Sequence, residues 1–134
     1  MSNNKVLVGG VLLILTGICF GALGAHGIKP LVSKDELESF KTGVDYQIYH
    51  GLSLLILFLL INQLKINLTW SIRIMFSGIL LFSGSIYLLS LKVPLGITSW
   101  AAFLGPVTPI GGILLITSWA LVLLRFYQHL KKGD

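Results

Sequence analysis

Four apolar segments, each long enough to cross a lipid bilayer, dominate this sequence. They cover residues 6–25, 44–64, 72–91 and 109–127. A hydrocarbon core of about 30 Å requires about 20 apolar residues in a helix, whose backbone groups are all hydrogen-bonded within the segment. Only 11% of the residues are charged, whereas about a quarter are charged in a typical soluble domain. We therefore predict an all-α, polytopic membrane protein in which residues 1–134 form one transmembrane four-helix bundle.

The second of these helices is predicted to begin before it enters the bilayer. Ser33 is followed three residues later by Glu36, which is the spacing of a capping box at a helix N-terminus. Asp35 places a second acidic residue in the same first turn, where it favours the helix dipole. The helix then continues through residues 46–50 into the aliphatic part of the second apolar segment, 44–64. We expect an interfacial extension on the second helix of the bundle.

Small side chains line one face of two predicted helices. They are Gly10, Gly17, Gly21 and Gly24 in the first span, and Ser77, Gly78, Gly84 and Ser85 in the third. Small residues allow helix backbones to approach closely in lipid, where no hydrophobic effect drives helices together. The two stripes are expected to meet each other. Packing within one chain and an interface in a homo-oligomer are both consistent with this pattern.

The distribution of cations predicts the orientation in the cell membrane. An even number of spans places both termini on one side. That side carries Lys5, Lys65, Arg73, Arg125, Lys131 and Lys132, and the opposite side carries Lys29, Lys34, Lys41 and Lys92. Cytoplasmic loops carry an excess of Lys and Arg. We therefore predict cytoplasmic termini, with the basic residues near lipid headgroups and not on nucleic acid.

Polar and aromatic side chains gather where the second helix is expected to enter the bilayer. Antiparallel spans bring this stretch to the same membrane face as the end of the first span and the start of the last, where Thr108 is the predicted N-cap. The predicted polar cluster consists of His26, Thr42, Tyr46, Gln47, Tyr49, His50, Thr108, Gly111 and Gly112. Unpaired N–H groups at the start of the last helix are suited to bind a lipid headgroup. The alternative is that Thr108 and its neighbours satisfy these groups within the chain.

The sequence offers little support for catalysis or metal binding. His26 and His50 could join a carboxylate such as Asp45, but the short spacings typical of zinc sites are absent. Serine, histidine and acid cannot be assigned to a catalytic triad from their spacing. Cys19 is the one cysteine, so an internal disulfide is excluded. We predict no metal, no cofactor and no catalytic residue.

Four motifs in this order resemble a known family. They are GALGAHG at 21–27, F-x-T-G-x-x-Y-Q-x-Y-H at 40–50, F-S-G-S-x-Y at 82–87 and T-P-x-G-G at 108–112. The chain is similar, over nearly its whole length, to the proteins grouped as domain of unknown function 423. These are small bacterial inner-membrane proteins with a related transmembrane protein of animals. The resemblance implies a four-span membrane protein and brings no activity or catalytic residues with it. Residues 92–104 match none of its motifs.

Two classes of function remain open at this point. The leading hypothesis is a non-enzymatic protein of the lipid bilayer, either a self-associating scaffold or a lipid-interacting protein, because glycine stripes are abundant while the middle of the spans lacks charge. The alternative is a carrier or channel for a small solute, which would have to oligomerise to enclose a path. An enzyme that acts on lipid headgroups is a third hypothesis.

Overall fold

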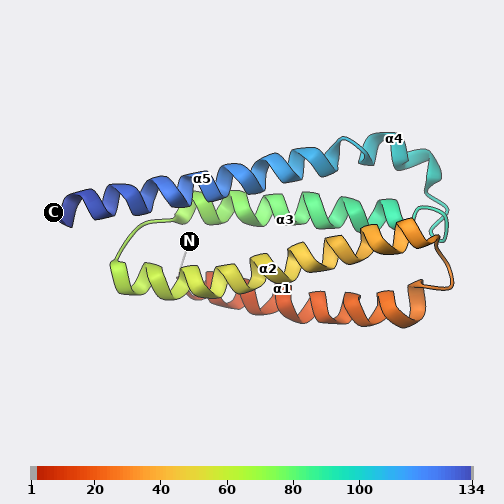
Figure 1. The fold of residues 1–134 in the computed structure, drawn as a ribbon, viewed down its shortest axis with the longest axis horizontal. Coiled ribbons are helices and arrows are strands. Elements are labelled where there is room, and N and C mark those ends of the chain that lie inside the picture. The colour runs from red at the N-terminus through yellow and green to blue at the C-terminus, as the bar shows by residue number, and fades with distance from the viewer. Residues whose placement is uncertain (1–2, 134) are drawn as a thin grey trace.

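Residues 3–133, which the computed structural model describes, form a bundle of helices that lie side by side (Figure 1). The long helices are α1 (Asn3–Leu23), α2 (Lys34–Leu64), α3 (Thr69–Ser90) and α5 (Val107–Gly133). A π-helix (Gly24–Ile28) extends α1, and two short helices, Thr98–Trp100 and α4 (Ala101–Leu104), lie between α3 and α5. Consecutive long helices are antiparallel, so both chain ends lie at one end of the bundle (Figure 1). We call this the terminal end, and the end that carries α4 the loop end.

The predicted all-α, four-span architecture is confirmed. Within the described residues, four helical segments are long and apolar enough to cross a membrane: Asn4–Ile28, Lys34–Leu64, Thr69–Ser90 and Thr98–Lys131. Large apolar side chains cover their outside; Leu80 and Ile116, for example, are 74% and 72% exposed. Exposed surface of this kind is stable only where the surrounding solvent is itself apolar.

The start of α2 has the predicted capping box. Glu36 donates its backbone N–H to the Ser33 hydroxyl at 3.2 Å, and Ser33 donates its own N–H to the Glu36 carboxylate at 3.0 Å. Lys92, just beyond α3, also donates to this carboxylate at 2.8 Å. At about 1.5 Å per residue, α2 is roughly 46 Å long, longer than a hydrocarbon core of about 30 Å. Its first turns therefore form the expected interfacial extension.

The helices pack in chain order, α1 on α2, α2 on α3 and α3 on α5. Their core has two apolar parts. One part lies towards the terminal end and includes Leu54, Ile72 and Met75, and the other lies towards the loop end around Phe40 and Val44. Between them along α2 and α3 lie buried polar side chains: Gln47, His50, Ser83 and Ser85. The buried polar groups are thus concentrated near the middle of the bundle.

Glycines set the close approach of α1 to α2. A Cβ on Gly10 would lie 3.0 Å from the carbonyl oxygen of Gly51, and a Cβ on Gly51 would lie 3.1 Å from that of Gly10. A Cβ on Gly17 would press on the side chain of Ile48, and a Cβ on Gly24 would lie 3.3 Å from the ring of Phe40, both on α2. The glycine stripe of α1 is therefore used for packing within the chain, which is one of the two alternatives that the sequence left open.

The second stripe of small residues does not meet the first. Gly78 packs against Leu115 of α5, and the Ser85 hydroxyl lies 2.7 Å from that of Thr108, also on α5. Gly84 has no atom within 4 Å of the position of a Cβ. The expected contact between the stripes is therefore corrected, because the glycines of α1 pack on α2 while Gly78 and Ser85 of α3 face α5.

Candidate functional site

A hydrogen-bonded network around Gln47 joins three helices near the middle of the bundle. Gln47 is 5% exposed and lies on α2. Its amide nitrogen donates to the Leu13 carbonyl oxygen at 2.9 Å and to the Thr16 hydroxyl at 2.7 Å, both on α1. Its amide oxygen accepts a hydrogen bond from the Tyr87 hydroxyl of α3 at 2.8 Å. Both N–H groups and the oxygen of the amide are thus paired, which fixes the position of the Tyr87 ring.

A groove runs along this network between α1 and α3. Its volume is about 510 Å³. We call it the α1–α3 groove, lined by Leu13, Thr16, Phe20, Gln47, Phe76, Ser77, Ile79, Leu80, Ser83, Gly84 and Tyr87.

Two features of the α1–α3 groove set it apart from ordinary helix packing. The Ser83 hydroxyl is buried and has no hydrogen-bond partner within the described residues. Gly84, one residue further on, faces empty space. The groove therefore combines apolar walls with a polar floor, and part of it is unfilled by the chain itself.

His50 lies on the other side of α2, in contact with α5. Its Nδ1 is 2.7 Å from the Tyr46 carbonyl oxygen, and its Nε2 is 3.3 Å from the indole nitrogen of Trp119. A carbonyl only accepts and an indole N–H only donates. These partners therefore assign the neutral imidazole with its proton on Nδ1. A second groove, of about 570 Å³, is lined here by Tyr46, His50, Phe82, Gly112, Leu115, Ile116 and Trp119.

The predicted polar cluster does not form as one site. Gln47 and His50 face different neighbours, and both contact the middle of another long helix, α1 or α5. Thirteen residues separate Gln47 from the start of α2, which is about 20 Å at 1.5 Å per residue. The expected single cluster is therefore corrected: Gln47 and His50 lie between the two apolar parts of the core and bond to different helices.

The other predicted cluster residues have local roles. His26 and Tyr49 are exposed, and the exposed Thr42 donates to the Glu38 carbonyl oxygen of its own helix. His26 lies at the loop end, as does the start of α5 (Figure 1). The antiparallel arrangement thus places these two stretches as expected, but without Gln47 and His50.

The start of α5 differs from its prediction. The helix begins at Val107, so Thr108 is its second residue and not its N-cap. The Thr108 hydroxyl pairs with Ser85 instead. A Cβ on Gly111 would overlap the backbone nitrogen of Phe82, and Gly112 lines the second groove. This helix start is therefore occupied by packing against α3.

Comparison with known proteins decides the family. The family model described as "Protein of unknown function (DUF423)" matches residues 20–112, which is more than half of the chain. The chain belongs to this family. It is 34% identical to a UPF0382 membrane protein of Staphylococcus haemolyticus over 89% of this chain and 92% of the relative. It is also 34% identical to the UPF0382 membrane protein YwdK of Bacillus subtilis, over 90% of this chain and 94% of the relative. No solved structure matches.

Membership of DUF423 agrees with the fold. The relatives are named membrane proteins, and the four long helices supply the spans. This chain is therefore an integral membrane protein. Within its described residues, His, Cys, Asp and Glu form no group of three that could hold a metal ion.

Sequence reasoning missed three residues that complete the two sites of this family member. Thr16 and Tyr87 bind Gln47, and Trp119 binds His50. Each is a hydrogen-bonding side chain within an otherwise apolar span, which is a signal in itself because such groups require partners in lipid. Their partners could not be assigned, since helix order in the chain does not specify which faces meet.

Proposed function

We propose that this chain is a non-enzymatic, lipid-interacting protein of the cell membrane, which holds an apolar chain of a membrane lipid in the α1–α3 groove. The observation that carries the proposal is the empty space beside Gly84. The bilayer core contains no water to fill such a space, and the walls around it, such as Phe20, Phe76 and Leu80, are apolar. Hydrocarbon is the occupant that fits these walls.

The groove is also preformed. The Tyr87 ring packs between Phe20 and Phe40, at centroid distances of 5.0 and 4.9 Å, while its hydroxyl is tied to Gln47. A wall that is already ordered does not lose side-chain entropy when a ligand binds. This rigidity supports retention of one lipid acyl chain in the groove, in place of free exchange with the surrounding lipid.

Filling the groove tests the proposal. We expect Gly84→Leu to lower, several-fold, the fraction of protein that retains a lipid in native mass spectra after extraction in mild detergent, because the leucine occupies the empty space. Ala120→Leu adds the same side chain on an exposed face of α5 and is expected to retain lipid as the parent chain does. Equal retention by the two variants would overturn the proposal.

Orientation and self-association form a second part of the proposal. Cations at the terminal end include Lys5, Lys65, Arg73, Arg125 and Lys131. This supports cytoplasmic termini. The outward face of α1, with Leu12, Leu15 and Ile18 between 51% and 59% exposed, supports contact with a second copy. The native mass spectra described above report such a homo-oligomer directly. No observation within the described residues favours a carrier or channel.

Single cysteines test the orientation. In a Cys19→Ser background, we expect Lys29→Cys to react with a membrane-impermeant maleimide added to intact cells. Lys65→Cys should react only after the cells are broken, because it lies at the opposite end of the bundle. The reverse pattern would show that the termini face outward.

A further inference from the structure

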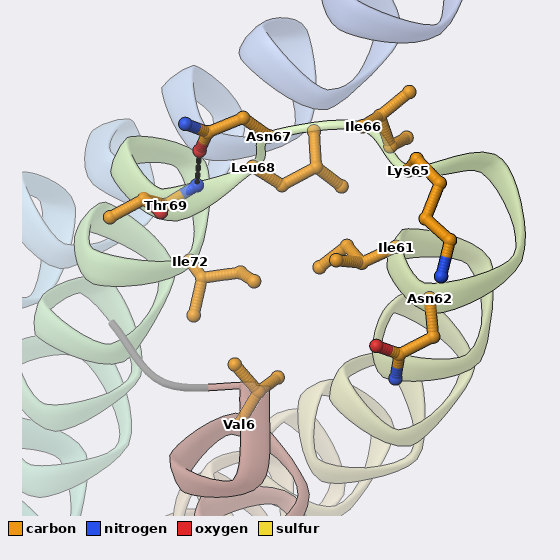
Figure 2. A pocket seen from close by; sticks show the side chains of 9 residues that line it. All are labelled: Val6, Ile61, Asn62, Lys65, Ile66, Asn67, Leu68, Thr69 and Ile72. Carbon is orange, nitrogen blue, oxygen red and sulfur yellow. Dashed lines mark hydrogen bonds between the residues drawn. The ribbon is translucent and has the colours of Figure 1, made fainter.

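A cavity at the terminal end combines an apolar base with a polar rim. It has a volume of about 340 Å³ and lies between the start of α1 and the turn that joins α2 to α3. Figure 2 shows Val6, Ile61, Leu68 and Ile72 around its centre, with Lys65 at its edge. The remaining lining residues are Asn62, Ile66, Asn67 and Thr69. We call this the terminal cavity.

A second hollow, of about 210 Å³, lies on the other side of the same turn. It shares Lys65, Ile66 and Asn67 with the terminal cavity and adds Arg125, Gln128 and His129 of α5. Asn67 accepts the Thr69 N–H through its side-chain oxygen at 3.0 Å. Its side-chain nitrogen points away from the terminal cavity in Figure 2. Residues 65–67 thus present cationic and amide donors between the terminal cavity and the second hollow.

Within the described residues, no acidic side chain pairs with the cations at this end. All four carboxylates within the described residues lie on Asp35, Glu36, Glu38 and Asp45, in the half of α2 nearer the loop end. The ion pair in this part of the chain joins Lys92 to Glu36, also at the loop end. No described carboxylate therefore neutralises the charge of Lys65 or of Arg125.

We propose that residues 65–67 bind the phosphate group of an anionic phospholipid, with Lys65 and Arg125 as its cationic partners and an acyl chain in the terminal cavity. Arginine and lysine bind phosphate through charge-assisted hydrogen bonds. Helix ends lie at headgroup level when helices cross a bilayer. The apolar base of the cavity distinguishes a lipid from free phosphate. This site is separate from the α1–α3 groove and does not depend on the function proposed above.

The backbone conformation of Lys65 provides a test of this proposal. Lys65 ends α2 in the left-handed conformation, with φ 55° and ψ 31°, where glycine is the favoured residue. A lysine is less favourable than a glycine in this conformation, so replacement by glycine relieves the backbone. Lys65→Gly is expected to raise thermal stability while it removes the proposed phosphate contact.

The experiment uses the full chain in nanodiscs that contain phosphatidylglycerol and phosphatidylcholine. Native mass spectrometry then measures which lipid the protein retains. We expect preferential retention of phosphatidylglycerol, reduced several-fold in Lys65→Gly and in Lys65→Gln/Arg125→Gln. The matched control Lys29→Gln/Lys41→Gln removes the same charge from the loop end and should keep the preference. Equal loss in the control pair, or no loss in the Lys65 variants, would overturn the proposal.

Two further arms separate the alternatives. Complete displacement of the lipid by inorganic phosphate at unchanged ionic strength would show that the site recognises phosphate alone, which contradicts the lipid assignment. Gly84→Leu should lower retention in the α1–α3 groove and leave the preference for phosphatidylglycerol unchanged. The two proposals therefore fail independently.

Discussion

Gly111→Ala is expected to destabilise the protein by about 2–3 kcal/mol, the upper part of the range for overpacking a core. The new Cβ would overlap the Phe82 nitrogen and lie 2.7 Å from its Cα. These are backbone atoms, so no change of rotamer relieves the contact. The helices α3 and α5 must therefore separate, and theirs is the most extensive helix–helix interface in the bundle. Thermal unfolding in detergent, followed by circular dichroism, measures the effect.

Gly84→Ala is the matched control for this prediction. Gly84 lies inside α3, and its Cβ would meet no atom within 4 Å. Alanine is preferred to glycine inside a helix by up to about 1 kcal/mol, so this variant should be as stable as the parent chain or slightly more so. Equal losses in the two variants would show that the contact between Gly111 and Phe82 does not set the helix spacing.

Gln47→Leu is expected to cost about 1–2 kcal/mol, as interhelical hydrogen bonds do in membrane bundles. The leucine leaves the Tyr87 hydroxyl without its acceptor and removes both bonds from α2 to α1. Thr16 keeps a bond to the Leu12 carbonyl oxygen of its own helix, which limits the loss. The same unfolding measurement applies.

A double variant separates the network from simple packing. In Gln47→Leu/Tyr87→Phe no hydroxyl is left unpaired, so we expect its loss to be smaller than the sum of the two single losses. Thr42→Val is the control, because the Thr42 hydroxyl is exposed and bonds only within its own helix. Additive losses would show that Gln47 and Tyr87 do not act together.

Much of the fold could be predicted because the bilayer restricts the choices. A stretch such as residues 6–25 has to be helical in lipid, since every backbone group must find a partner within it. Ser33 and Glu36 indicate a helix start through local contacts alone, and the structure has this capping box. The apolar spans and this capping box were therefore predictable from residues that are close together in the chain.

The candidate sites were harder to predict because they depend on helix rotation. Gln47 and His50 are three residues apart, yet one bonds to α1 and α3 and the other to α5. Thr108 matched an N-cap pattern, but tertiary contact with Ser85 uses its hydroxyl. Neither outcome follows from periodicity, which defines a polar face without naming the helix that covers it.

The sequence by itself determined that this protein is a four-span helical membrane protein, because apolar length and backbone hydrogen bonding leave no other solution in lipid. Only the tertiary structure decided that α1 uses its glycines against α2, that Gln47 and His50 serve separate sites and that Gly84 borders an empty groove. Those features arise from which helix faces meet, and side-chain packing between distant segments selects among rotations that are equally apolar.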